Sequence, residues 1–315
     1  MKSFIPWVGG KRSILHIILD CFPNQYERYI EPFGGGGSVI LGKPKTPFEV
    51  YNDFDGDLVN LFRCVKFRPF RLLKEIHRMP YNARQDFPLL QRILEGENFH
   101  EMFLDEELMI AGEMLPAKEY KEIKKILVGK AKEFDVTRAA AFYLQCHYSY
   151  AGGRTSIDCR GSTILRTLPA ILMAYRRLAE VFIENKDFEA LLGQYDRPGA
   201  FFYLDPPYYM TEKMYKAAFT RDDHVRLRDK LASLQGKWLL SYNDCPEIRE
   251  LYKDYYIIEF ERLNSIAQQF EAGCQFKEVL IANYDLEKTR KDKHTQLTMF
   301  NYLNEKDGNG AALSV

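Results

Sequence analysis

The 315-residue sequence has no net charge, because 44 lysine and arginine residues are balanced by 44 aspartate and glutamate residues. A protein that coats nucleic acid indiscriminately needs an overall positive charge, so that class is excluded, although a local basic patch is not. The sequence also lacks a signal-peptide pattern at its N-terminus and any apolar run long enough to span a bilayer. We therefore expect a cytoplasmic protein with no membrane-spanning segment.

The cysteines lack the short paired spacings of a zinc cluster. There are six of them, at Cys21, Cys64, Cys146, Cys159, Cys245 and Cys274. This scatter is typical of a reducing compartment, so we expect mostly buried packing cysteines and no metal. With 46% apolar and 28% charged residues, the chain has the composition of a globular protein with one large core and a second unit.

The most informative stretch is a run of apolar residues, Phe201–Leu204, followed by Asp205, Pro206, Pro207 and Tyr208. An apolar run without alternation predicts a strand covered on both faces. The prolines cannot donate ladder hydrogen bonds, so the strand must end there and present Asp205 at its carboxyl end. Ligands bind in the crevice at this edge of an open α/β sheet. A plain proline-stiffened turn is the alternative, and the added tyrosine argues against it.

A second informative stretch is the glycine run Gly34–Gly37, which follows a short strand around Tyr29–Glu31 and precedes a helix. Such a loop is typical of the first strand-to-helix turn of a nucleotide-binding sheet. Val39 stands where the dinucleotide pattern has its third glycine, and Pro44 stands where a phosphate loop has serine or threonine. We therefore expect a ligand without a pyrophosphate.

The next predicted strand, Phe48–Asp53, also ends in an acid. An acid at this place binds ribose hydroxyls in related folds, and we assign that role to Asp53. We expect Asp55 and Asp57 to cap the following helix. Lys11, at a glycine turn near the N-terminus, is a candidate for binding an anionic group, with a plain turn as the alternative.

From about Arg63 to Val181 the sequence changes to helical periodicity. We expect helices over Phe70–Met79, Ala117–Leu127, Val136–Gln145 and Leu168–Ile183. Residues 151–180 carry five arginines against two acids, which is a local basic patch, although a solvated face is the alternative reading. Strand patterns then resume at Lys237–Asp244, Tyr255–Phe260 and Glu278–Asn283. The sheet is therefore split by a mostly helical insertion.

Five segments in order resemble the DNA adenine N6-methyltransferases of the Dam and DpnM type, the D12 class or alpha group. They are Trp7–Lys11, Glu31–Ser38, Asn52–Asp53 with Asp57–Leu58, Asp187–Phe188 and Asp205–Tyr208. The resemblance implies an α/β fold, with a Rossmann-like methyltransferase sheet and an inserted, mostly helical DNA target-recognition domain. It also implies a catalytic domain of residues 1–62 and 182–285, an insertion of residues 63–181, and a polar tail of residues 286–315.

The resemblance implies S-adenosyl-L-methionine as cofactor, double-stranded DNA as substrate and a flipped-out adenine as target. The cofactor-binding residues that it implies are Trp7, Lys11, Phe33, Gly34, Gly36, Ser38, Asp53, Asp187, Phe188 and Asp205. In the catalytic role, Asp205 and the Pro206 carbonyl would accept the two amino hydrogens, and Tyr208 would stack on the base. For reading DNA bases we select Tyr150, Arg154 and Arg160, since arginine pairs well with guanine edges.

The resemblance leaves other readings open. The segment Ser149–Ser162 does not reproduce the recognition segment of GATC enzymes, so no target sequence is implied. A methyltransferase for cytosine N4, RNA or protein glutamine is one alternative, and a non-catalytic DNA-binding relative is another. Near the C-terminus, Gln296–Phe300 resembles a peptide that docks on the replication sliding clamp, with a packed terminal turn as the alternative. A cognate restriction endonuclease is a further expected partner.

Overall fold

The computed structural model describes residues 1–79, 87–95, 104–131, 134–149, 168–210, 219–263 and 275–295. Seven strands in these ranges form a sheet of order β3-β2-β1-β4-β5-β7-β6. The strands are β1 (Arg28–Glu31), β2 (Phe48–Asn52), β3 (Val181–Glu184), β4 (Ala200–Leu204), β5 (Lys237–Asn243), β6 (Tyr256–Leu263) and β7 (Gln275–Ala282). This mixed α/β architecture confirms the predicted fold class.

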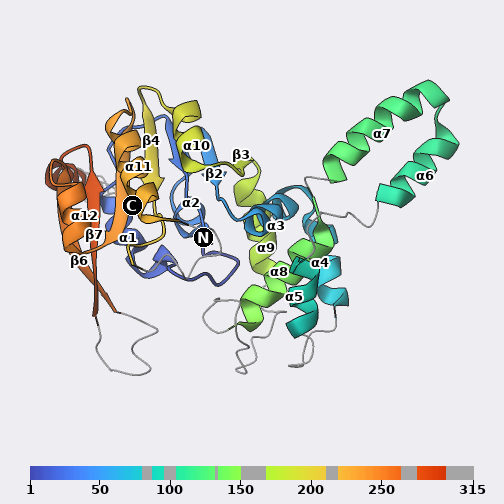
Figure 1. Cartoon of the computed structure of the whole chain (residues 1–315), viewed down its shortest axis with the longest axis horizontal. Coiled ribbons are helices and arrows are strands. Elements are labelled where there is room, and N and C mark those ends of the chain that lie inside the picture. The colour runs from blue at the N-terminus through green and yellow to red at the C-terminus, as the bar shows by residue number, and fades with distance from the viewer. Residues whose placement is uncertain are drawn as a thin grey trace, which may run out of the picture. The chain divides into compact units, whose positions relative to one another are not determined.

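The chain divides into two compact units. The first contains Met1–Arg12 and Glu31–Phe188, and the second contains Ser13–Ile30 and the described chain from Glu189 onward. Figure 1 labels most of the helices and strands. The helices of the described chain up to Leu178 are η1 (Lys11–Ile14), α1 (Leu15–Asp20), α2 (Ser38–Gly42), α3 (Gly56–Phe67), α4 (Pro69–Arg78), α5 (Phe87–Glu95), α6 (Leu104–Met114), α7 (Ala117–Ala131), α8 (Val136–Tyr148) and α9 (Leu168–Leu178). They are followed by α10 (Phe188–Tyr195), α11 (Arg221–Ala232) and α12 (Pro246–Leu251).

Strands of the second unit carry its core. β4 pairs in parallel with β1 and with β5, while β7 pairs antiparallel with β5 and β6. Every residue of β4 is buried, which confirms the prediction of a strand covered on both faces. Phe22 lies with its ring centroid 4.6 Å from that of Phe201, and Trp238 of β5 is fully buried. The carboxyl end of β4 is therefore held in place by strand pairing on both sides and by close packing.

Helices of the first unit pack around α8. Contacts join α8 to α3, α4 and α5, and join α9 to α2, α3 and α4. Ala139, Ala140 and Ala141 of α8 are fully buried, and such small residues let neighbouring helices approach closely. Figure 1 shows α6 and α7 as neighbouring helices, and their contacts agree. The helical periodicity predicted for this region is thus observed.

One predicted helix is shorter than expected. We expected a helix over Leu168–Ile183, but α9 ends at Leu178 and Val181–Glu184 forms strand β3. Val181, Phe182 and Ile183 favour strands because they are β-branched or aromatic. They pair in parallel with β2, and Phe182 stacks on Phe48 with ring centroids 5.0 Å apart. Pairing with β2 outweighs the helical periodicity, which runs past the end of α9.

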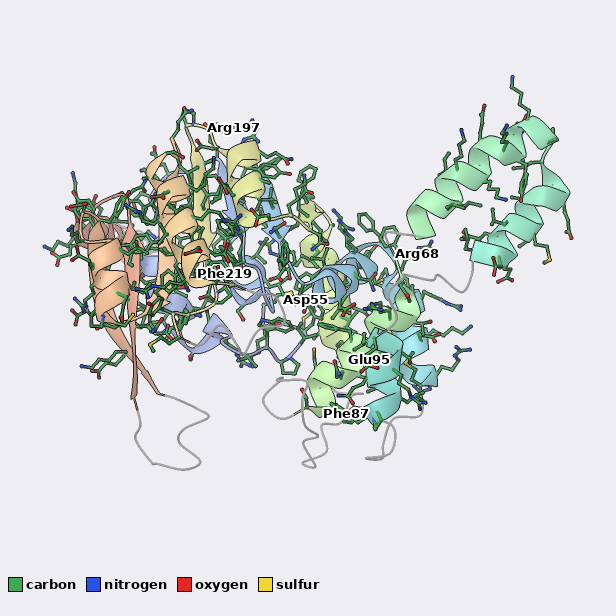
Figure 2. All side chains as sticks on the ribbon, in the orientation of Figure 1. Asp55, Arg68, Phe87, Glu95, Arg197 and Phe219 are labelled. Atoms are coloured by element: carbon green, nitrogen blue, oxygen red, sulfur yellow. The ribbon has the colours of Figure 1, made fainter. Side chains whose placement is uncertain are left out.

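The role predicted for Asp57 is also wrong. Figure 2 labels Asp55 at the start of α3, where its carboxylate accepts hydrogen bonds from the amides of Asp57 and Leu58. Asp55 alone therefore caps the helix. Asp57 is buried instead and pairs with Arg138 of α8, whose guanidinium also donates to the Leu94 carbonyl at 2.7 Å. The acid thus joins α3 to α8 and α5.

Candidate active site

The glycine loop between β1 and α2 is a tight turn held by its own backbone. The Gly34 amide donates to the Asn52 carbonyl at 2.8 Å, and the Gly37 amide donates to the Gly34 carbonyl at 2.8 Å. Gly35 has φ of 48° and Gly37 has φ of 68°, a left-handed conformation that favours glycine. The loop thereby stays close to the end of β2.

Neighbouring aromatic rings occupy the space that side chains on this loop would need. A Cβ on Gly34 would lie 2.2 Å from Tyr51 Cε2, and one on Gly36 would lie 2.7 Å from Trp7 Cβ. Tyr51 is fully buried, and its hydroxyl donates to the Gly35 carbonyl at 2.7 Å. The loop is therefore glycine-rich because Trp7 and Tyr51 pack directly against its backbone.

Asp53, at the end of β2, is tied to the glycine loop. Its Oδ2 accepts from the Gly35 amide at 2.8 Å, and its Oδ1 accepts from the Asp55 amide at 2.9 Å. Burial raises the pKa of Asp53 to about 6, and the hydrogen bonds from Asp55 and Gly35 oppose that shift. The carboxylate is thus fixed in orientation and poised to change charge just below neutral pH.

Asn52 joins three segments of the first unit. This side chain is 1% exposed, and its Nδ2 donates to the carbonyls of Pro32, at 2.8 Å, and Lys186, at 3.0 Å. Its Oδ1 accepts from the Lys186 amide at 2.8 Å. The hydrogen bonds hold the backbone just before Asp187 and Phe188 beside the end of β2. The structure thus brings Asp187 toward the segment that carries Asp53, as a ligand site built from both requires.

Apart from Asp205, which belongs to the second unit, the remaining residues predicted for the cofactor lie in the first unit. The Phe33 and Phe188 rings are 5.5 Å apart at an interplanar angle of 34°. Lys11 is 3% exposed, and its ammonium donates to the Gly9 carbonyl at 3.0 Å. A Cβ on Gly10 would lie 3.5 Å from the hydroxyl of Ser38, the first residue of α2. The N-terminal turn therefore approaches the start of α2.

The second unit presents Asp205 at the carboxyl end of β4. Asp205 is half-buried, and its Oδ1 accepts a hydrogen bond from the Ser241 hydroxyl at 2.8 Å. Pro206 is buried directly after it, and Tyr208 is 7% exposed. The amide of Asn243, the last residue of β5, donates to the Tyr209 carbonyl at 3.2 Å. The Asp-Pro-Pro-Tyr turn is therefore held by the end of the neighbouring strand.

Aromatic residues support the same turn. The Tyr208 and Tyr242 ring centroids lie 6.1 Å apart, and His224 of α11 lies 5.3 Å from the Tyr209 ring in an edge-on arrangement. His224 Nδ1 is 2.6 Å from the Tyr242 hydroxyl, and both residues are buried. Figure 2 labels Phe219, which lies just before α11 and whose ring is 4.8 Å from His224. Tyr208 and Tyr209 are thus held by packing against the buried residues Tyr242 and His224.

Sequence reasoning missed the residues that hold the backbone and side chains of the candidate site in place. Asn52 belongs to a segment that resembles the family, but the sequence predicts no role for it. It also predicts none for Tyr51, Ser241 or Asn243. A polar residue in or at the end of an apolar strand was the available signal, since a buried polar group needs a partner. Tyr150, Arg154 and Arg160, predicted to read DNA, lie outside the described residues. Within the described ranges, no cluster of histidine, cysteine and acidic residues could hold a metal ion.

Comparison with known proteins places these features in a family. The family model described as D12 class N6 adenine-specific DNA methyltransferase matches residues 7–266. Among curated proteins, the type II methyltransferase M1.LlaDCHI of Lactococcus lactis subsp. cremoris is 25% identical over 296 residues, covering 90% of this chain and 96% of that protein. The DNA adenine methylase of Haemophilus influenzae is 42% identical over 67 residues, covering 21% and 22%. The family model and the match to M1.LlaDCHI therefore both extend over the two compact units.

Proposed function

The chain belongs to the D12 class of N6 adenine-specific DNA methyltransferases. We propose that it methylates a flipped-out adenine at specific DNA sites and that Asp205, Pro206 and Tyr208 form the catalytic turn. The observation that carries this assignment is the carboxylate of Asp205 at the end of a fully buried strand, hydrogen-bonded to Ser241 and followed by two prolines. The methyl donor that we propose is S-adenosyl-L-methionine. When bound, it supplies an electrophilic methyl group on a cationic sulfur.

The chemistry of the target explains why an acid is needed. The adenine amino nitrogen is a poor nucleophile because its lone pair is delocalised into the ring. Asp205 and the Pro206 carbonyl would accept hydrogen bonds from its two N–H groups, which localises the lone pair on the nitrogen and directs it at the methyl group. The nitrogen would release one of its two protons as it gains the methyl group. Catalysis of this kind consists mainly of positioning and electrostatics. Tyr208 stacks on the base once it has left the duplex.

Of the residues that we propose for the donor, all but Asp205 lie in the first unit. Asp53 accepts from the ribose hydroxyls, since its carboxylate is held in place by the Gly35 and Asp55 amides. Asp187 accepts from the adenine amino group of the donor, and Phe188, paired with Phe33, packs on that ring. The glycine loop, Trp7, Lys11 and Ser38 complete the pocket. These residues fit a ligand with hydroxyl and amino donors and without a phosphate.

The central test is the substitution Asp205→Ala. We expect methyl transfer to fall by at least about 10³-fold, because the amino group loses its principal charged acceptor, while donor binding survives in part. Incorporation of labelled methyl groups into DNA measures the first effect, and equilibrium dialysis of the donor measures the second. Digestion of the product and mass spectrometry would identify N6-methyladenine. The substitution of an exposed acid of the same unit, Asp229→Ala, is the matched control and keeps full activity.

Near-normal turnover by the Asp205→Ala variant would contradict the catalytic role proposed for Asp205. Detection of methyl groups on cytosine, RNA or protein, with none on adenine, would overturn the proposed function. Sequencing of the methylated DNA would give the target site. We propose that Tyr150, Arg154 and Arg160 select that site.

DNA is the substrate of the family, and two further partners remain proposals. Gln296–Phe300, outside the described residues, is proposed to dock on the replication sliding clamp. A cognate restriction endonuclease is proposed because M1.LlaDCHI and other relatives are named type II methyltransferases. In the described part of the chain, no helix combines the length and the apolarity that a bilayer crossing requires.

A further inference from the structure

Two buried hydroxyl groups lie behind the catalytic carboxylate. Ser241 of β5 is fully buried, and its Oγ lies 2.8 Å from Asp205 Oδ1 and 3.3 Å from the Leu204 carbonyl. The hydroxyl of Tyr203, which is 1% exposed, lies 3.2 Å from the same Oγ. A continuous path of hydrogen-bonding oxygen atoms thus runs from Tyr203 through Ser241 to Asp205.

The chemistry of the three groups gives this path a direction. A carboxylate accepts hydrogen bonds and does not donate, so Ser241 must be the donor to Asp205. A serine hydroxyl has one proton, and its shorter, charge-assisted bond goes to Asp205 in preference to Leu204. With that proton committed, the Tyr203 hydroxyl must donate to Ser241. Each bond polarises the next, which strengthens the hold on the carboxylate.

We propose that Ser241 and Tyr203 are positioning residues that fix the orientation of the Asp205 carboxylate for accepting the amino hydrogen. This inference rests on the proposed function. Neither residue is a catalytic residue in this proposal, because each acts through Asp205. A misplacement of about 1 Å at a reacting group can cost on the order of 10²-fold in rate.

The pairing of β4 and β5 fixes the relative positions of Tyr203, Ser241 and Asp205. β4 and β5 are paired in parallel with a defined register, Tyr203 opposite Leu239 and Leu204 opposite Leu240. Tyr203 and Asp205 are two residues apart, so their side chains leave the same face of the extended chain. Sites built on strands hold their groups more rigidly than sites built on loops.

The substitution Ser241→Ala is the direct test. We expect kcat to fall by about 10- to 100-fold in methylation of adenine, while the Kd for S-adenosyl-L-methionine and the KM for DNA change by less than about threefold. Single-turnover rates per active enzyme, with active sites counted by the burst amplitude, separate this effect from partial unfolding. A purely structural role would lower the burst amplitude and the Tm and leave the single-turnover rate intact.

The second variant, Tyr203→Phe, removes one oxygen at the far end of the path. We expect kcat to fall by about three- to fivefold, and we expect no further fall when this substitution is added to Ser241→Ala. The matched control is Tyr252→Phe in the same unit. Tyr252 is buried, and its hydroxyl has no hydrogen-bond partner within the described ranges, so this variant should keep the wild-type rate.

The outcomes separate this inference from the function on which it rests. If the wild-type protein makes no N6-methyladenine, the proposed function fails. If the wild-type protein methylates adenine and Ser241→Ala matches its rate, only the positioning role is overturned. If Tyr203→Phe lowers kcat by the same factor in the wild-type protein and in the Ser241→Ala variant, the two residues act independently. That result would overturn the proposed path from Tyr203 through Ser241. Should Ser241→Ala fail to fold, an unchanged kcat in Tyr203→Phe would overturn the proposal.

Discussion

Gly34 shows how one residue can serve two purposes. Its amide closes the loop onto the Asn52 carbonyl, and its missing side chain makes room for the Tyr51 ring. Tyr51 cannot move aside easily, because it stacks on Phe62 with ring centroids 4.0 Å apart. Packing by itself therefore requires glycine at this position, whether or not a ligand also approaches the backbone.

The substitution Gly34→Ala should destabilise the protein by about 1–3 kcal/mol, because the new methyl group overlaps the Tyr51 ring. Donor affinity should fall with it, since the loop and Asp53 share a hydrogen bond. Urea denaturation and donor binding measure the two effects. Gly56→Ala is the matched control, because a Cβ there meets its first neighbour, Asn185 Oδ1, at 3.8 Å. Equal stability of the two variants would contradict the packing argument.

The raised pKa of Asp53 predicts a pH-dependent affinity. The folded protein holds the Asp53 proton more tightly than the unfolded chain, so this residue's contribution to stability falls as pH rises from about 4 to about 6. Donor binding should show the opposite trend, since ribose hydroxyls and a sulfonium both favour the ionised carboxylate. We expect affinity to increase as pH rises through about 6 and to level off above about 7.

Isothermal titration calorimetry between pH 5 and pH 8 measures this dependence. Asp53→Asn keeps the shape of the side chain and cannot ionise, so its donor affinity should be lower at pH 7.5 and should lose the dependence on pH around 6. A pH profile that is identical in both proteins would show that another group is responsible.

Local sequence placed the two candidate acids at strand ends but did not reveal the residues that hold the candidate site together. Asp53 and Asp205 stand at the ends of predicted strands, so a pattern of a few residues located both. Asn52 holds the backbone of Lys186, 134 positions away, and Ser241 holds Asp205, 36 positions away. Such partners depend on which strands become neighbours, and a short window of sequence does not contain that information.

At the level of elements, strand patterns were predicted where burial covers both faces and at the edge strand β6, and were missed at the other edge strand, β3. β4 was recognised because its apolar run is unbroken. β3 is an edge strand with Phe182 about half exposed, and its pattern continues the helical period of α9. β3 was missed because its pairing with β2, which determines its conformation, cannot be read from its own sequence.

A buried ion network fastens α9 to β2 and to the end of α2. Glu49 of β2 is 3% exposed and binds both Lys43 and Arg177, each with an N–O distance of 2.5 Å. Arg177 also donates to the Ile40 carbonyl at 2.6 Å. Burial would raise the pKa of Glu49, but hydrogen bonds from Arg177 and Lys43 outweigh it and hold that pKa below its ordinary value.

The substitution Glu49→Gln should cost about 3–5 kcal/mol at pH 7, because it removes the buried carboxylate that binds both the Lys43 ammonium and the Arg177 guanidinium. Since the folded pKa of Glu49 is lowered, its stabilisation is present above the unfolded pKa and is lost as pH falls through the folded value. The variant should therefore lose less stability on acidification than the wild type. Chemical denaturation at pH 7 and pH 4 checks both points, and the exposed pair variant Glu250→Gln should match the wild type.

On the scale of the whole molecule, the family match ends at residue 266 and leaves the last 49 residues outside it. We propose that residues 1–62 and 182–285 form the catalytic domain, that 63–181 select the DNA site, and that 286–315 form a separate tail. Helix α8 of this insertion contacts the N-terminal segment, since His147 Nε2 is 3.2 Å from the Phe4 carbonyl and the Trp7 and Phe142 rings are 6.3 Å apart. Helix α8 and the N-terminal segment that we propose to bind the donor are therefore in direct contact within one compact unit.

The packing of Trp7 against the glycine loop also has an optical consequence. The chain has two tryptophans, and each compact unit contains one of them. Trp7 is half-buried over Gly35 and Gly36, while Trp238 is fully buried in β5 and donates its indole proton to the Leu231 carbonyl at 3.1 Å. The two indoles therefore differ in polarity and solvent access. Intrinsic fluorescence thus provides separate signals for the glycine loop, where we propose that the donor binds, and for strand β5, which holds the proposed catalytic turn.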